Sequence, residues 1–245
     1  MPEENNNFIN NPDPVPNNQG ALNDVAMTNN QIANKGVPPE DGNPVNPQME
    51  EKSLPPQKNS QKEVFGKSEM LNAGTILKDV LGISVGSMVA DLGAGGGMFS
   101  IQSARLVGDQ GQVYAVDILK NTLSEIESKA RMAGLYNIKT IWSNLEVVGA
   151  TKINEGTLDF TLLVNVLFQS TKHYEMMAEA ARLLKPGGKL LIIDWDNTKP
   201  AFTPPSNMQV EPTKLNEYAH QLDLNLVKDF KAGQYHFGII FSKVQ

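Results

Sequence analysis

A glycine-rich segment directly after an apolar run limits the folds open to this chain. Ser87 to Asp91 is short and apolar, and the sequence then reads Asp91-Leu-Gly93-Ala-Gly95-Gly-Gly97. Such a run predicts a buried strand, and the glycines predict a tight turn that ligand atoms can approach closely. Met98 to Val107 carries apolar residues at helical spacing, so the turn opens a helix whose first N–H groups are unpaired. The sequence therefore predicts a ligand site at a strand–turn–helix junction.

Beyond this junction, strand patterns alternate with helix patterns. We expect strands at 112–117, 137–142, 158–164 and 189–194, and helices at 121–132, with Asn121 as the cap, 174–184 and 213–222. Apolar strands separated by helices predict a mostly parallel sheet covered on both faces. The last two strands, at 224–230 and 235–243, leave no room for a helix and must pair as a hairpin. We thus expect an α/β protein whose ligands bind beyond the carboxyl ends of the parallel strands.

The first 62 residues have a different composition from the rest. They hold ten of the 15 prolines, many asparagines and one aromatic residue, Phe8, with four Lys against eight Asp or Glu. Such a segment buries too little apolar surface to offset chain entropy, so residues 1–62 are expected to be a disordered, acidic tail before a folded domain at 63–245. A solubilising spacer is preferred over an interaction arm as its role, and any partner of the tail is unknown.

The remainder of the chain is almost neutral, with 17 basic and 19 acidic residues. This balance argues against a generally basic surface for nucleic acid, although a local patch is not excluded. The absence of cysteine excludes a disulfide scaffold, a cysteine nucleophile and a cysteine-ligated metal. No apolar run approaches the roughly 20 residues of a membrane span, so we expect a cytoplasmic protein without membrane insertion.

The second strand also ends in an acidic residue, Asp117, about 20 residues after the glycines. A carboxylate there can accept two hydrogen bonds from a ribose diol, as in both NAD enzymes and methyltransferases. The glycine turn reads G-x-G-x-G, because Met98 stands where a dinucleotide fingerprint needs glycine. A nicotinamide oxidoreductase is therefore the weakest alternative.

Three segments together resemble class I S-adenosylmethionine-dependent methyltransferases, and most closely the small group related to ubiquinone/menaquinone biosynthesis. They are Asp91-Leu-Gly-Ala-Gly-Gly-Gly97, Val113-Tyr-Ala-Val-Asp117 and Leu184-Lys-Pro-Gly-Gly-Lys189. The resemblance covers about residues 64–243. It implies a Rossmann-like, seven-stranded and mostly parallel sheet with helices on both faces and a C-terminal antiparallel hairpin. It also implies S-adenosylmethionine as the cofactor.

The resemblance implies a role for particular residues. The glycine turn would hold the methionine portion of the cofactor, Asp91 would orient its amino-acid end, and Asp117 would bind the ribose. Asn144 replaces the acid usual after the third strand, and its side-chain oxygen can still accept from the adenine amine. Asn165 belongs to the segment that would face the methyl group. The full expected cofactor set is Asp91, Gly93, Ala94, Gly95, Gly97, Asp117, Ile118, Asn144, Leu145 and Asn165.

Residues near the ends of the fourth, fifth and seventh strands are candidates for the acceptor side. Phe168, Trp195 and Tyr235 are expected to contact the substrate, since Trp195 could wall an apolar or aromatic molecule. The catalytic residue is unknown, with Asn165, Asp194 and His236 as candidates. The three histidines are scattered, so no metal site is expected.

Methyl transfer to a small molecule is the preferred function. A methyltransferase acting on RNA or protein, and a cofactor-binding module without activity, remain alternatives. Phe65 to Leu77 precedes the first strand and is expected to form a partial lid over the cofactor.

Overall fold

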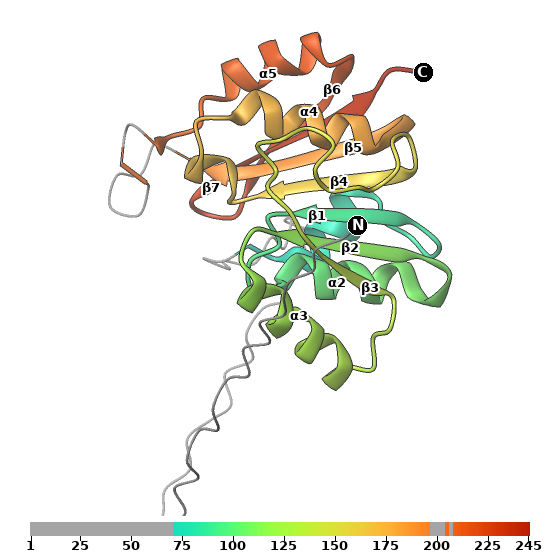
Figure 1. The fold of residues 1–245 in the computed structure, drawn as a ribbon. Coiled ribbons are helices and arrows are strands. Elements are labelled where there is room, and N and C mark those ends of the chain that lie inside the picture. Colours follow the sequence, from blue (N-terminus) through green and yellow to red (C-terminus); the bar gives the residue numbers. More distant parts are fainter. Residues whose placement is uncertain (1–70, 197–203, 206–207) are drawn as a thin grey trace, which may run out of the picture. The chain divides into compact units, whose positions relative to one another are not determined.

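The computed structural model describes residues 71–196, 204–205 and 208–245, and these form a seven-stranded sheet covered by helices (Figure 1). The strands are β1 (Met88–Leu92), β2 (Gln112–Asp117), β3 (Ile138–Trp142), β4 (Leu158–Val164), β5 (Leu184–Trp195), β6 (Leu224–Ala232) and β7 (His236–Lys243). The α-helices are α1 (Ala73–Thr75), α2 (Met98–Val107), α3 (Lys120–Met132), α4 (His173–Leu183) and α5 (Pro212–Gln221). There are also a π-helix, η1 (Ile76–Leu81), and two 3-10 helices, η2 (Gly108–Gln110) and η3 (Leu167–Gln169).

The strand order is β3-β2-β1-β4-β5-β7-β6. The first five strands pair in parallel, whereas β7 pairs antiparallel with both β5 and β6. The predicted α/β, Rossmann-like sheet with a terminal hairpin is therefore confirmed. The order reverses between β1 and β4, so the crevice for a ligand is expected at the carboxyl ends of these two strands.

Alternate residues of the central strands pack into two separate apolar cores. Ala90 and Leu92 of β1 face a core formed with α4 and α5, while Val89 faces a core formed with η1 and α2. Ala115 of β2 packs with Ile126 of α3. Because side chains alternate across a strand, one strand contributes to both layers, which is why the central parts of β1, β2, β4 and β5 carry apolar residues on both faces.

The cap of α3 and the start of β5 differ most clearly from expectation, while the other expected ends lie within two residues of the observed ones. Asn121 does not cap α3, which begins one residue earlier, at Lys120, and has Leu119 at its N-cap. The Leu119 N–H instead donates to Asp117 Oδ1 at 2.9 Å, so the carboxylate at the end of β2 already turns the chain into the helix. β5 begins at Leu184 rather than at Lys189, and its pairing with β4 is interrupted by a register shift between Leu158 and Phe160.

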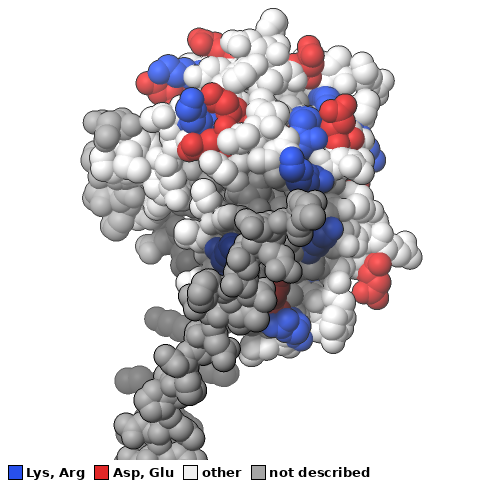
Figure 2. All heavy atoms as spheres, viewed as in Figure 1, with Lys and Arg blue, Asp and Glu red and all other residues white. Residues whose placement is uncertain are grey.

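The expected tail at 1–62 lies outside the described residues, as does the 65–70 part of the expected lid. No helix in the described ranges is long and apolar enough to cross a bilayer. Basic and acidic side chains are interspersed over the face shown in Figure 2.

Candidate active site

A cavity of about 520 Å³ opens at the carboxyl ends of the parallel strands. This volume lies in the range of small-molecule and cofactor sites, and the position is the one that the strand order indicates. Segments after β1, β2, β3 and β4 supply most of its wall: Asp91, Gly93, Ala94, Gly95, Gly96, Met98, Phe99, Asp117, Ile118, Leu119, Thr122, Ser143, Asn144, Leu145, Glu146, Val164, Asn165, Val166, Gln169 and Ser170, with Met176 of α4.

The glycine turn forms the floor next to β1, and its glycines have different neighbours. Gly93, Gly95 and Gly97 all have positive φ angles. A Cβ atom on Gly93 would lie 2.4 Å from Val166, and one on Gly97 would lie 2.7 Å from Ile126. A Cβ on Gly95 would meet nothing closer than the Gly93 carbonyl oxygen at 4.0 Å. Gly93 and Gly97 are thus required by packing within the protein, whereas Gly95 faces open space that a ligand can enter.

Asp91 is almost fully buried at the end of β1. Its Oδ2 accepts a 2.6 Å hydrogen bond from the hydroxyl of Ser100, which lies in the first turn of α2. Burial raises the pKa of Asp91 to about 6, partly countered by the bonds from Ser100. The carboxyl group therefore stands beside the glycine turn and at the N-terminal end of α2, where negative charge is favoured.

Asp117 ends β2, the strand next to β1, and binds the glycine turn directly. Its Oδ2 accepts from the Gly95 N–H at 2.9 Å, and its Oδ1 accepts from the Leu119 N–H at the same distance. An ionised carboxylate has about four lone-pair positions, so two remain for a ligand. Ile118, beside it, is 57% exposed.

The segment after β3 forms the wall next to Asp117. The Ser143 N–H donates to the Asp117 carbonyl oxygen at 3.1 Å, which joins the two strand ends. Asn144 Oδ1 accepts from the Glu146 N–H at 2.9 Å, so this side chain folds back on its own backbone. Leu145 is buried, and the Glu146 carboxylate accepts from the Ser170 hydroxyl at 2.6 Å.

Asn165 follows β4 and has a left-handed backbone, with φ of 51°. Its N–H donates to the Ile193 carbonyl oxygen at 2.8 Å and its carbonyl oxygen accepts from Gln169 at 2.9 Å. Its side-chain oxygen is buried and has no hydrogen-bond partner. An unpaired buried oxygen and a rare backbone conformation at one cavity residue are typical of functional sites.

Asp194 lies near the end of β5, next to β4, and does not line the cavity. It is fully buried, and it accepts from the N–H groups of Trp195 at 2.9 Å and Phe168 at 3.3 Å. Burial raises its pKa to about 6. The carboxyl group thus ties the turn after β4 to the end of β5.

Three aromatic side chains, Phe168, Trp195 and His236, form a cluster near Asp194. The ring centroids of Trp195 and His236 are 4.4 Å apart, and Phe168 meets Trp195 edge-on at 6.4 Å. Trp195 Nε1 and both ring nitrogens of His236 are buried without a hydrogen-bond partner, and burial lowers the pKa of His236. The backbone of Tyr235 accepts from Asp196 at 2.7 Å.

A family profile described as a methyltransferase domain matches residues 83–235. This chain belongs to the methyltransferase-domain family. The matched segment begins before β1 and ends just before β7.

Two relatives with similar sequences are named as the same enzyme. The chain is 33% identical over 131 residues to the ubiquinone/menaquinone biosynthesis C-methyltransferase UbiE of Haemophilus ducreyi, covering 53% of this chain and 49% of that protein. It is 36% identical over 132 residues to the same enzyme of Blochmanniella pennsylvanica, covering 54% and 50%. The chain thus spans about half the length of the curated relatives it matches.

Solved structures share the fold. A SAM dependent methyltransferase from Aquifex aeolicus superposes with a TM-score of 0.65 at 23% identity, covering 72% of this chain and 92% of that one. A putative type 11 methyltransferase from Sulfolobus solfataricus superposes with a TM-score of 0.57 at 20% identity, covering 71% and 94%.

The cavity brings together nine of the ten residues expected to bind the cofactor. Gly97 is the tenth, and it faces Ile126 instead. Of the acceptor-side and catalytic candidates, only Asn165 lines the cavity, while Asp194, His236, Phe168, Trp195 and Tyr235 lie outside its lining. In the described part of the expected lid, Ile76 and Leu77 pack into the core with α2, and no residue of 71–77 lines the cavity.

Sequence reasoning also missed several cavity residues. Ser143, Glu146, Ser170 and Met176 carry no motif, and only the fold brings them to the cavity. The nearest signal was the polar run Ser143-Asn144 at the expected end of a strand.

Proposed function

We propose that this protein transfers the methyl group of S-adenosylmethionine to a small-molecule acceptor and that the cavity holds the cofactor. The observation that carries the proposal is the contact between Asp117 and Gly95. It places a carboxylate with free acceptor positions directly over the part of the glycine turn that is open to a ligand. A ribose diol and the adjoining amino-acid chain would be held together at this point.

The other cavity residues fit the remaining parts of the cofactor. Asp91 at the start of α2 suits the ammonium group of the amino-acid end. Ile118 and Leu145 offer apolar surface for adenine, and Asn144 retains donor and acceptor capacity. Asn165 also lines the cavity, and its side chain, whose oxygen has no hydrogen-bond partner, would contact the sulfonium or its methyl group.

S-adenosylmethionine supplies a strongly electrophilic methyl group on a sulfonium. In the transfer, the acceptor atom would bond to the methyl carbon while the carbon–sulfur bond broke, and the electron pair of that bond would stay on sulfur. The residues of the cavity would bind, orient and exclude water, since an in-line displacement depends chiefly on alignment at roughly 3–3.5 Å.

The acceptor is proposed to approach from the β5–β7 side, past Asn165. Trp195, Phe168 and Tyr235 would offer aromatic surface there. His236, whose lowered pKa keeps the imidazole neutral at pH 7, could take a proton from the acceptor, and Asp194 would hold the turn that carries Asn165 and Phe168. The UbiE relatives are named as C-methyltransferases of ubiquinone/menaquinone biosynthesis, which supports a small acceptor of quinone type. We further propose that the protein acts in the cytoplasm.

The test uses S-adenosylmethionine with a tritiated methyl group and fractionated cell extract. We expect label in a small-molecule fraction with the wild-type protein and little with Asp117→Asn. Label in RNA or protein would replace the proposed acceptor class. Calorimetric binding of the cofactor without transfer to any fraction would favour an inactive binding module.

A further inference from the structure

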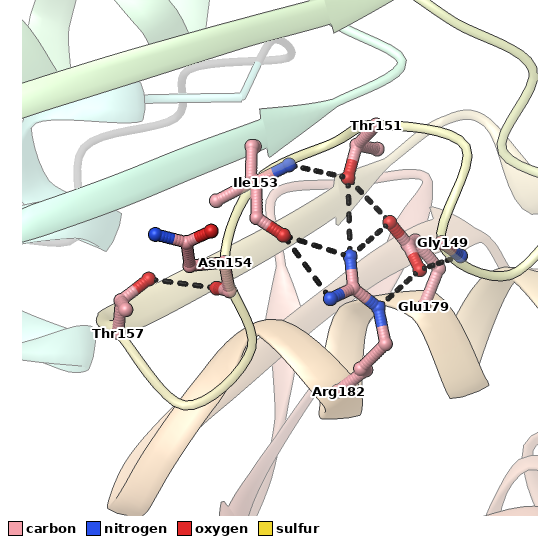
Figure 3. A network of polar contacts seen from close by, with 7 residues as sticks. All are labelled: Gly149, Thr151, Ile153, Asn154, Thr157, Glu179 and Arg182. Carbon is pink, nitrogen blue, oxygen red and sulfur yellow. Dashed lines mark hydrogen bonds and ion pairs between the residues drawn. The ribbon is translucent and has the colours of Figure 1, made fainter.

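A buried ion pair on α4 holds the segment that links β3 to β4. Glu179 is fully buried, and Arg182 binds it through two hydrogen bonds of 2.8 Å, from Nε to Oε2 and from Nη2 to Oε1 (Figure 3). This two-pronged geometry is among the strongest that charged side chains form in proteins.

The pair grips the β3–β4 segment at three alternate residues. The Gly149 N–H donates to Glu179 Oε2 at 2.6 Å, and the Thr151 hydroxyl donates to Glu179 Oε1. Arg182 Nη1 and Nη2 both donate to the Ile153 carbonyl oxygen at 3.1 Å (Figure 3). Glu179 accepts hydrogen bonds from the segment and Arg182 donates hydrogen bonds to it, so both members of the ion pair hold the segment.

The same segment forms one wall of the cavity. Ser143, Asn144, Leu145 and Glu146 line it, and Gly149 follows only three residues later. Between the two regions, the chain makes tight turns, with the Ala150 N–H donating to the Val147 carbonyl oxygen at 3.0 Å. A displacement at residues 149–153 would therefore be transmitted to the wall within a short stretch of chain.

Stability alone is a weak reason for such a pair. Buried ion pairs lose hydration that their attraction only partly repays, and apolar residues of similar volume often stabilise as well or better. Glu211, at the N-cap of α5, and Lys214 have the same spacing, but both are largely exposed, and neither side chain binds a loop among the described residues. Hydrogen bonding from Arg182, Thr151 and Gly149 nevertheless holds the pKa of Glu179 below its usual value despite burial.

We propose that Glu179 and Arg182 are positioning residues, which fix the cavity wall at 143–146 for the adenosine end of the cofactor. This inference rests on the proposed function, because it assigns that wall to adenosine. The pair touches no ligand itself and acts through the segment at 149–153.

The test is calorimetric binding of S-adenosylhomocysteine to variants of Thr151. Thr151→Val keeps the shape of the side chain but removes the hydroxyl that binds Glu179, whereas Thr151→Ser keeps the hydroxyl and loses a methyl group. Positioning predicts that Val weakens binding on the order of tenfold, the effect of a lost hydrogen bond to a charged group, and that Ser binds like wild type. A packing role predicts the reverse order, because Ser leaves the larger void.

Glu179→Gln provides a second route to the same answer. Arg182 donates to both carboxylate oxygens, so in either orientation the amide NH2 of Gln faces an N–H donor of Arg182, and binding should again weaken. Glu211→Gln breaks the matched pair on α5 and should bind like wild type. Equal affinities for Thr151→Val and wild type, or weaker binding by Thr151→Ser than by Thr151→Val, would overturn the inference. Failure of the wild type to bind S-adenosylhomocysteine would instead overturn the proposed function, and the inference with it.

Discussion

Asp117 combines two tasks that a single carboxylate can perform together. It accepts from the N–H groups of Gly95 and Leu119, which fixes the glycine turn and the start of α3, and it keeps lone pairs for a ligand. In Asp117→Asn, the side-chain NH2 must face one of these two N–H groups, so one hydrogen bond is lost. We expect cofactor affinity to fall roughly 10- to 100-fold, the cost of losing charge-assisted hydrogen bonds, as measured by calorimetry with S-adenosylmethionine.

Asp109→Asn is the control for this change. Asp109 is an exposed acidic residue in η2, after the helix that the glycine turn opens, and it does not line the cavity. Its replacement removes the same charge and should leave affinity unchanged. Equal binding by wild type and Asp117→Asn would remove Asp117 from the cofactor site.

Asp194 gives a prediction about pH. Its pKa is about 6 in the folded protein against 3.8 as the ordinary value, so the folded state holds the proton more tightly than the unfolded chain. The stabilisation that this provides is complete below about pH 3.8 and is lost as pH rises through 6. Asn at this position cannot ionise, so Asp194→Asn should gain stability relative to wild type between pH 4 and pH 7, by up to about 3 kcal/mol.

Urea unfolding of both proteins across this range measures the difference. The contributions of Asp91 and His236 are present in both and cancel. A difference in unfolding free energy that stays constant from pH 4 to pH 7 would show that Asp194 is ionised in the folded protein throughout.

For single residues, the sequence was sufficient to locate several site residues but not to predict their contacts. Asp91, Asp117 and Asn165 could be located because each ends a strand that periodicity reveals. The unpaired oxygen of Asn165 and the grip of Asp194 on Phe168 could not be predicted, since both depend on how β5 lies beside β4. The Glu179–Arg182 pair was missed because three-residue spacing on a helix also describes the exposed pair on α5.

At the scale of elements, the glycine turn contains one glycine needed for packing and another that faces the space for a ligand. An added Cβ at Gly97 would collide with Ile126, whereas one at Gly95 would enter the cavity. We expect Gly97→Ala to lower the free energy of unfolding by about 1–3 kcal/mol through overpacking and backbone strain. Gly95→Ala should cost about 1 kcal/mol for its left-handed backbone and weaken cofactor binding more strongly.

Thermal melting without ligand and calorimetry with S-adenosylmethionine distinguish the two effects. The ranking of the variants should reverse between the two measurements. If Gly95→Ala bound normally, the space beside this glycine would not belong to the cofactor.

The boundaries of elements show where local patterns fail. The helix patterns placed α2, α4 and α5 within one residue of their observed ends. The start of α3 was also placed within one residue, but its cap was wrong, because the Asp117 carboxylate, rather than Asn121, binds the N–H of the N-cap residue Leu119. β5 was expected to begin after the Pro-Gly-Gly turn, yet Leu184 already pairs with Leu158 before it, and only the partner strand reveals this.

For the whole molecule, alternation of strands and helices was sufficient to predict the parallel sheet and the terminal hairpin. Apolar strands that need cover on both faces leave few other arrangements. The described residues from 71 onward contain both of these apolar cores and the cavity residues named above. The first 62 residues contribute one aromatic side chain and ten prolines, and more acidic than basic groups. Folding and cofactor binding should therefore not need them.

Removal of residues 1–62 tests this division of the chain. Because the shortened protein keeps both cores, its unfolding midpoint in urea and its affinity for S-adenosylmethionine should match those of the full chain. Its net charge changes from −6 to about −2, so any difference should appear in solubility near neutral pH rather than in binding. Low salt, where charge effects reach furthest, is the most demanding condition for the comparison. A loss of affinity in the shortened protein at both low and high salt would mean that the segment contributes to the cofactor site, and the proposed domain boundary would move towards the N-terminus.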